Sequence, residues 1–155
     1  GGCSFGGLPQ RDLDPGQKAG VSMVIEGITA RFDCGNGEQY ERIGAFWDRM
    51  RALCPGRPLS GVGYGWRNDS LRYLIGTEQG VPKTALEKVQ KLLPDAAYTS
   101  VELPDSGWKA YTGTADTLDI LYAEIYRDGP LDFEIERFDE AGNADIRVWR
   151  QDTAL

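Results

Sequence analysis

Two successive copies of a strand–helix–hairpin pattern restrict the fold of this chain more than any other feature of its sequence. The first copy begins with residues 21–33, where β-branched side chains alternate and predict a strand. Residues 39–53 then place apolar side chains at helical spacing, and a Cys-Pro-Gly sequence ends the run. Two short β-like runs around the turn-prone tetrapeptide 67–70 predict a hairpin.

The second copy follows the same order. Residues 98–113 predict strand with a central Pro-Asp-Ser-Gly break, and residues 114–130 predict a helix closed by Gly-Pro. Residues 131–138 and 144–150 predict two strands joined by a loop with hairpin chemistry.

Together the copies predict an α+β domain at residues 20–155, built as a tandem pseudo-twofold β-α-β-β repeat. Its halves would lie at about 20–80 and 97–150. Two such units can form an antiparallel sheet with both helices on one face, which leaves a ligand groove on the opposite face or at the seam between the units.

Two segments lie outside this pattern. Residues 84–93 predict a short linker helix between Pro residues, with a capping box formed by Thr84 and Glu87. Residues 1–19 are rich in Gly, Pro and charge without a sustained period, and they predict a flexible N-terminal arm.

Composition excludes several classes of function. The chain contains no histidine, which excludes Ser-His-Asp and Cys-His nucleophile systems and His-ligated zinc. Its three cysteines lack a CxxC spacing, so we expect reduced thiols in a cytoplasmic protein, with no metal and no cofactor. The net charge of -7 disfavours direct contact with nucleic acid. No apolar run approaches the ~20 residues of a transmembrane helix, so no membrane partner is expected.

Residue alternation in the last two strands predicts which side chains share a face. One predicted face is aliphatic and would pack on the helices: Leu131, Phe133, Ile135, Ile146 and Val148. The other combines charged and aromatic side chains: Glu134, Glu136, Phe138, Arg147 and Trp149. That second face has the composition of a site for a flat or cationic organic molecule.

Two questions stay open at this level. Trp66, Trp108 and Trp149 lie on predicted strands, where they either line a groove or simply cover a sheet face. Glu136, if buried, needs a partner for its charge. That partner is either a nearby arginine, such as Arg137 or Arg147, or a ligand cation.

Four segments carry a resemblance to a known family. They read IEGITARF, YGWRNDSLRYLIGTE, VELPDSGWKAYTGTADTLDILYAEIYRD and IERFDEAGNADIRVWR. In order and spacing they resemble the GyrI-like small-molecule-binding family over about residues 20–150. That family includes the effector-binding domains of AraC- and MerR-type transcription regulators and stand-alone relatives.

The resemblance implies a tandem of two strand–helix–strand–strand units that bind amphipathic, often cationic aromatic compounds in an aromatic groove. It places a counter-charge glutamate in the segment Ile135-Glu136-Arg137-Phe138, so this role falls on Glu136. Phe138 stands where tyrosine is common in the family, which removes a hydroxyl. The linker helix at 84–93 is an apparent insertion.

Three functions are compatible with these features. The first is a stand-alone binding module that senses or sequesters a small lipophilic cation, and its expected ligand-binding residues are Glu136, Trp66, Trp108, Tyr111, Phe138 and Trp149. The second is a hydrolase of reactive aromatic natural products, as some relatives are, acting through a carboxylate. The third is a gyrase-inhibitor-like contact with a protein. No catalytic residue is assigned, and a homodimer or a partner protein is left open.

Overall fold

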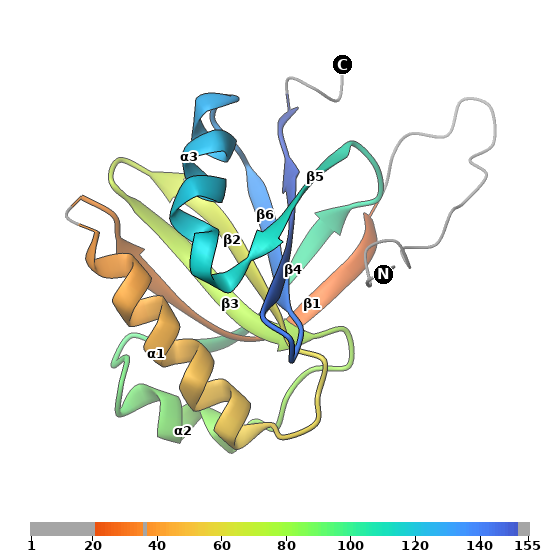
Figure 1. Ribbon diagram of the computed structural model, residues 1–155. Helices are drawn as coiled ribbons and strands as arrows, with labels where there is room; N and C mark the ends of the chain where they lie inside the picture. The colour runs from red at the N-terminus through yellow and green to blue at the C-terminus, as the bar shows by residue number, and fades with distance from the viewer. Residues whose placement is uncertain (1–20, 36, 152–155) are drawn as a thin grey trace. The chain divides into compact units, whose positions relative to one another are not determined.

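A computed structural model describes residues 21–35 and 37–151 of the chain, and the predicted arm at 1–19 lies outside these residues. The described part contains seven β-strands and three α-helices, which confirms the α+β class (Figure 1). In chain order the elements are β1 (Val21–Asp33), α1 (Glu38–Leu53), β2 (Ser60–Arg67), β3 (Ser70–Thr77), α2 (Ala85–Gln90), β4 (Ala97–Pro104), β5 (Trp108–Thr114), the 3-10 turn η1 (Ala115–Thr117), α3 (Leu118–Arg127), β6 (Phe133–Phe138) and β7 (Asn143–Trp149). No helix in this part has the length and apolar character needed to cross a membrane.

The described residues divide into two compact units. The N-terminal unit is Ile25–Val101, and the C-terminal unit comprises residues 21–24 and 102–151. The order strand, helix, hairpin occurs in the N-terminal unit as β1, α1, β2 and β3, and in the C-terminal unit as β5, α3, β6 and β7. The pseudo-twofold relation and the ligand groove stay predictions.

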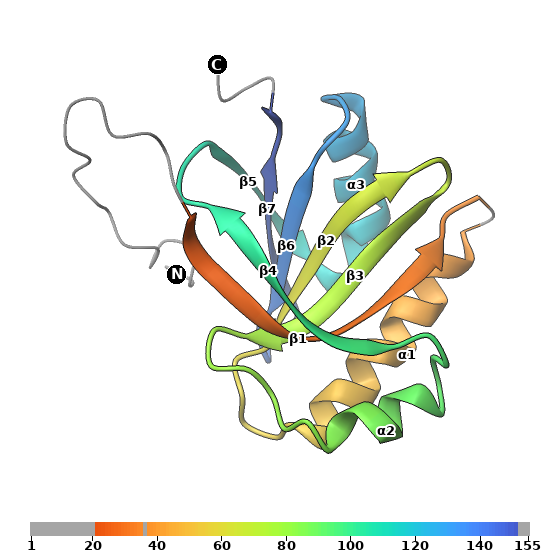
Figure 2. The ribbon, with the colours of Figure 1, turned by 180° about the vertical axis from the view of Figure 1, so that it is seen from behind.

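In the N-terminal unit the strands lie in the order β4-β1-β3-β2, and β3 pairs antiparallel with both β1 and β2 (Figure 2). Helix α1 buries Phe46, Trp47 and Met50. The Phe46 ring stacks on Phe32 of β1 at a centroid distance of 6.1 Å. This helix therefore supplies much of the core of its unit, as its apolar spacing predicted.

A buried hydrogen bond links α1 to β3. The Trp47 indole N–H donates to the Tyr73 hydroxyl at 2.8 Å, and the two side chains are 6% and 1% exposed. Gly61 makes room for this pair, because a Cβ at that position would lie 2.8 Å from Cζ2 of Trp47 and closer still to the Tyr73 hydroxyl.

Tyr73→Phe is expected to lower the free energy of unfolding by about 1 to 2 kcal/mol, because it removes the acceptor of a buried indole N–H while it keeps the ring. Urea unfolding followed by tryptophan fluorescence measures the change. A loss below about 0.5 kcal/mol would show that the bond contributes little net stability.

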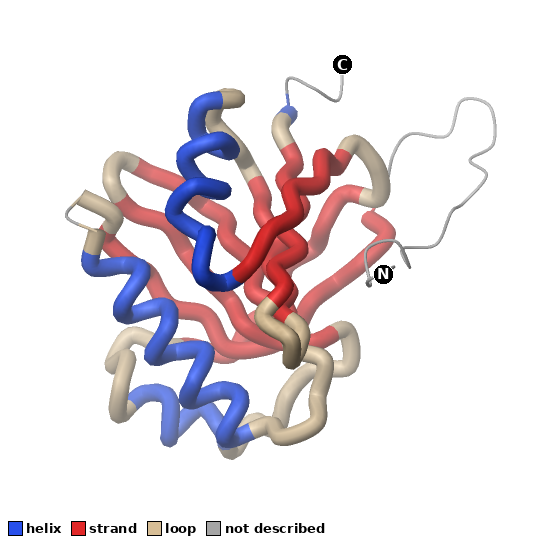
Figure 3. The backbone as a smooth tube through the Cα atoms, viewed as in Figure 1, coloured by secondary structure: helices blue, strands red, loops and turns tan. Residues whose placement is uncertain are grey.

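The predicted capping box at Thr84 is wrong. Thr84 has helical backbone angles, φ -63° and ψ -19°, and its side chain makes no capping bond. An N-cap residue needs an extended backbone, whereas here a turn in which the N–H of Ala85 bonds the carbonyl of Pro82 leads into the helix. Helix α2 is also shorter than predicted, and the chain after Gln90 continues as turns (tan in Figure 3).

Helix α2 lies beside α1 within the N-terminal unit (Figure 1). Arg49 of α1 donates to the carbonyl of Lys88 at 2.9 Å. Val89 and Leu93 are buried, so this segment contributes to the core of the unit.

In the C-terminal unit the strands lie in the order β6-β7-β5, and both pairings are antiparallel. The predicted break falls between Pro104 and Trp108, where Gly107 has φ 93°. Helix α3 buries Leu121, Tyr122 and Ile125. Its first turn is preceded by η1, whose capping box joins Thr114 and Thr117.

Candidate functional site

Glu136 lies on β6 and points toward helix α3. Its side chain is 5% exposed, and the Tyr122 hydroxyl of α3 donates a hydrogen bond to its Oε2 atom. The predicted orientation, with the aliphatic face on the helices and the acidic face opposite, is therefore wrong. The register gives the reason: Glu136 pairs directly with Ile146 and Glu134 with Val148, so acidic and aliphatic side chains share the face that α3 covers.

The contact with Tyr122 was not foreseen from the sequence. Of the two arginines named as candidate partners, Arg137 follows Glu136 on β6 and Arg147 lies on the neighbouring strand β7. Arg147 pairs with Ile135 across the strands and forms an ion pair with Asp145 at 3.1 Å. Tyr122 was predicted only as part of the apolar stripe of its helix. The Tyr122 hydroxyl could have predicted this contact, because a tyrosine in an apolar stripe buries its hydroxyl, and a buried hydroxyl needs a polar partner.

A second buried carboxyl, that of Glu134, also belongs to the site. Its side chain is 3% exposed, and within the described residues its Oε2 atom has no hydrogen-bond partner. Burial raises the pKa of the Glu134 carboxyl well above its ordinary value, and the neighbouring Glu136 raises it further, while a hydrogen bond from Tyr122 opposes both effects. Alternation in the sequence predicted that Glu134 shares a face with Glu136, but Glu134 was not among the expected ligand-binding residues.

Aromatic side chains extend from the two carboxyls toward the surface. The rings of Tyr122 and Tyr126, one turn apart on α3, have centroids 5.8 Å apart and an interplanar angle of 31°. Tyr122 is buried, whereas Tyr126 is 46% exposed. Phe138 is half-buried and lies on the same face of β6 as Glu136. Tyr122 thus contacts the acidic pair, Tyr126 packs on Tyr122, and Phe138 lies on the strand face that carries both carboxyls.

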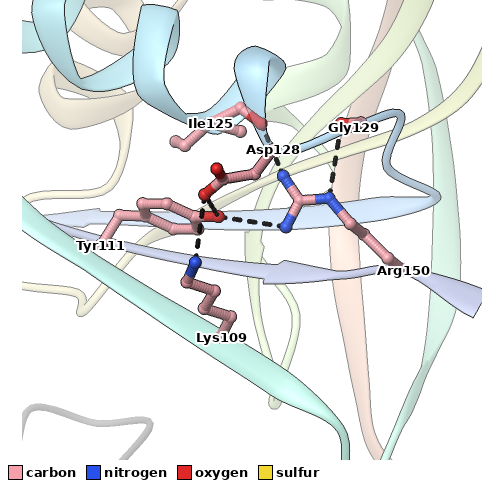
Figure 4. A network of polar contacts seen from close by, with 6 residues as sticks. All are labelled: Lys109, Tyr111, Ile125, Asp128, Gly129 and Arg150. Atoms are coloured by element: carbon pink, nitrogen blue, oxygen red, sulfur yellow. Dashed lines mark hydrogen bonds and ion pairs between the residues drawn. The ribbon is translucent and has the colours of Figure 1, made fainter. Parts of the chain in front are cut away.

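Tyr111 shares this face of the strands, but its hydroxyl belongs to another network (Figure 4). It donates to Asp128 Oδ2 at 2.8 Å and accepts from Arg150 at 3.1 Å. Lys109 also contacts Asp128, at 3.0 Å. The hydrogen bond from Tyr111, followed by that from Lys109, lowers the pKa of the Asp128 carboxyl. The polar end of Tyr111 is therefore engaged in holding the end of α3.

Two of the three predicted tryptophans, Trp108 and Trp149, lie on the other face of the strands from Glu136. Trp149 pairs with both Trp108 and Phe133, so these rings lie on the opposite face of the strands. The indole N–H groups of Trp108 and Trp149 donate to the carbonyls of Pro104 and Ser106, each at 2.9 Å. Trp66 is on β2 in the N-terminal unit and is half-buried. Of the six expected site residues, the C-terminal unit brings Glu136, Tyr111 and Phe138 to one face.

Nothing in the described part of the chain suggests a metal centre, because no three His, Cys, Asp or Glu side chains there are grouped to hold an ion. The site itself offers two carboxyls and a phenol.

Comparison with known proteins gives matches among solved structures alone. No protein-family model matches this chain, and no curated protein matches it in sequence. A Staphylococcus aureus protein provisionally described as a bacterial transcription regulation protein is 13% identical, with a TM-score of 0.47 over 81% of this chain and 90% of that one. A protein solved with bound tetraphenylphosphonium is 14% identical, with a TM-score of 0.45 over 81% of this chain and 87% of that one. At these scores neither match assigns a function to the chain.

Proposed function

We propose that the C-terminal unit binds small lipophilic organic cations, with Glu136 as the counter-charge, as a sensing or sequestering domain of the GyrI-like kind that its motifs resemble. The observation that carries the proposal is the burial of Glu134 and Glu136 on one face beneath a tyrosine-bearing helix. Two adjacent buried carboxyls are costly unless a proton or a cation compensates their charge.

The surroundings of the pair suit an aromatic or lipophilic cation better than a metal ion. Tyr122 and Tyr126 offer ring faces, and each good cation–π contact can contribute about 2 kcal/mol when it is desolvated. Phe138 and the ring of Tyr111 would add apolar wall on the same face. A small hydrated ion would gain nothing from these rings, whereas an organic cation buries apolar area against them.

Glu136→Gln is expected to weaken binding of tetraphenylphosphonium at least about tenfold, because the amide keeps the size of the side chain but removes its charge. Binding of the neutral triphenylphosphine oxide should change little. Isothermal titration calorimetry measures both affinities.

Glu124→Gln provides the matched control, since it makes the same change on an exposed position of α3. It should leave both affinities unchanged. Equal losses for the cation and the neutral compound in Glu136→Gln would contradict the role of Glu136 as counter-charge.

One observation favours the hydrolase as a second candidate. A carboxyl with a raised pKa beside a second carboxyl is an arrangement suited to general acid–base catalysis. In that case Glu134 would donate a proton and Glu136 would activate water on a strained aromatic electrophile. Multiple turnovers that are lost in Glu136→Gln would support the enzyme, whereas stoichiometric binding without product would support the binding module.

A further inference from the structure

Two arginines face each other on neighbouring strands of the N-terminal unit. Arg31 of β1 pairs directly with Arg72 of β3, and Arg72 pairs in turn with Tyr64 of β2. These three strands lie side by side (Figure 2). Directly paired residues of antiparallel strands point to the same face of a sheet, and like charges at such positions repel each other. This face is opposite to α1, because the adjacent residues Phe32 and Tyr73 contact that helix.

Neither arginine forms an ion pair with a carboxylate in the described part of the chain. The Arg31 Nη1 atom donates to the Ser70 hydroxyl at 2.9 Å. The Arg72 guanidinium makes no hydrogen bond to any described residue. Both arginines are half-buried. Because a guanidinium carries five N–H donors, most of the donors of this pair are unused.

Three acidic residues belong to the same end of these strands, and all three are exposed. Asp33 lies two residues after Arg31 on β1, and Asp69 lies in the turn between β2 and β3. Asp95 precedes β4 and accepts a hydrogen bond from the backbone N–H of Arg31 at 3.1 Å. Arg67, at the end of β2, adds a further exposed positive charge. Solvent screens exposed carboxylates, so they compensate the half-buried arginines only in part.

A hydroxyl donor lies on the same face. The hydroxyls of Tyr64 and Thr29 share one hydrogen bond at 2.8 Å, and Thr29 is two residues before Arg31 on β1. Two hydroxyl groups carry two protons, and this bond uses one of them. Neither hydroxyl makes another hydrogen bond within the residues that the structure describes, so one O–H proton is left over.

We propose that Arg31, Arg72 and Tyr64 bind a phosphate dianion, either inorganic phosphate or the phosphate group of a monoester. Its two negative charges match the two guanidinium charges, and its oxygens accept hydrogen bonds from N–H and O–H donors. A carboxylate carries one negative charge and would leave the second arginine uncompensated. This site lies within the N-terminal unit, and it does not depend on the cation binding proposed for the C-terminal unit.

NMR titration of the arginine Nε–H signals of the full chain measures binding of inorganic phosphate at about pH 8, where the dianion predominates. The two signals that disappear in Arg31→Gln and in Arg72→Gln should shift along one saturating curve in the wild type. Arg72→Gln should weaken binding at least about tenfold, because it removes one of the two charges. The absence of a saturable shift in the wild type would overturn the site.

Arg127→Gln is the matched control, since it makes the same change at an exposed position of α3. It should leave the affinity for phosphate unchanged. Acetate should bind to the wild type at least about tenfold more weakly than phosphate. Equal affinities for the two anions would overturn the preference for a dianion.

Urea unfolding gives a second readout. In chloride buffer Arg72→Gln should have the same midpoint as the wild type or a higher one, because it removes the repulsion between paired like charges. Phosphate at the same ionic strength stabilises proteins in general. It should nevertheless raise the midpoints of the wild type and of Arg127→Gln more than that of Arg72→Gln, since only the first two keep the site. Equal rises in the three proteins, or a clear loss of stability of Arg72→Gln in chloride, would contradict the proposal.

Phenyl phosphate distinguishes the two sources of the dianion. Tighter binding than that of inorganic phosphate would identify a monoester as the ligand, whereas equal or weaker binding would identify free phosphate. Tyr64→Phe should weaken binding of the preferred anion about threefold or more, because it removes a hydroxyl proton and keeps the ring. An unchanged affinity in this variant would exclude the hydroxyl from the site.

Discussion

Gly27→Ala should destabilise the N-terminal unit by about 3 kcal/mol or more, among the largest effects expected of a single methyl group. Gly27 of β1 pairs directly with Gly76 of β3. A Cβ at Gly27 would lie 2.6 Å from the Cα of Gly76, and one at Gly76 would lie 2.9 Å from the Cα of Gly27. Carbonyl oxygens of Ile75 and Glu26 lie closer still. These obstacles are backbone atoms, so a side chain cannot rotate away to relieve the clash.

Gly44→Ala is the matched control. Gly44 is exposed in helix α1, and a Cβ there would meet no atom within 4 Å. Alanine at this position should stabilise the protein by about 0.5 to 1 kcal/mol. Urea unfolding of both variants measures the two effects. A stable Gly27→Ala variant would show that β1 and β3 do not approach each other as described.

Arg150→Met is expected to lower the free energy of unfolding by about 3 kcal/mol, because it leaves the end of helix α3 without its donor. The Arg150 side chain is 6% exposed, and it donates to the carbonyls of Ile125 and Gly129 at 2.6 and 3.3 Å (Figure 4). It also donates to the Tyr111 hydroxyl at 3.1 Å. Methionine fills a similar space but satisfies none of these acceptors.

Lys109→Met is the matched control, because it replaces an exposed basic side chain of the same network with methionine. The Lys109 side chain is 60% exposed, so solvent screens its ion pair with Asp128, and losing this pair should cost far less than losing the buried bonds of Arg150. Chemical denaturation of the two variants should therefore give clearly different midpoints. Similar losses in both would show that Arg150 acts mainly as a surface charge.

The strand and helix order could be predicted because it depends on local periodicity. Helix α1 and hairpin strands β6 and β7 occur where apolar spacing and turn residues predicted them. The start of α2 was less predictable. At Thr84 the choice between a cap and one more helical residue depends on the turn that precedes it, which no two-residue motif encodes.

The candidate site was predicted in its central residue and not in its surroundings. Glu136 was singled out by its motif, and it is buried. Trp149 was grouped with it by alternation counted along each strand separately. The register between strands decides whether two such faces coincide, and here the pairing of Trp149 with Phe133 places the indole on the other face.

By itself, the sequence determined the α+β class, the order of the elements and the presence of an acidic, aromatic last hairpin, because these follow from short-range spacing and residue type. Only the tertiary structure decided that Glu134 and Glu136 are buried together under Tyr122 and that Tyr111 is bound to the end of α3. Those contacts join residues of different elements, and they depend on strand register and helix docking, which are set by the packing of the whole unit.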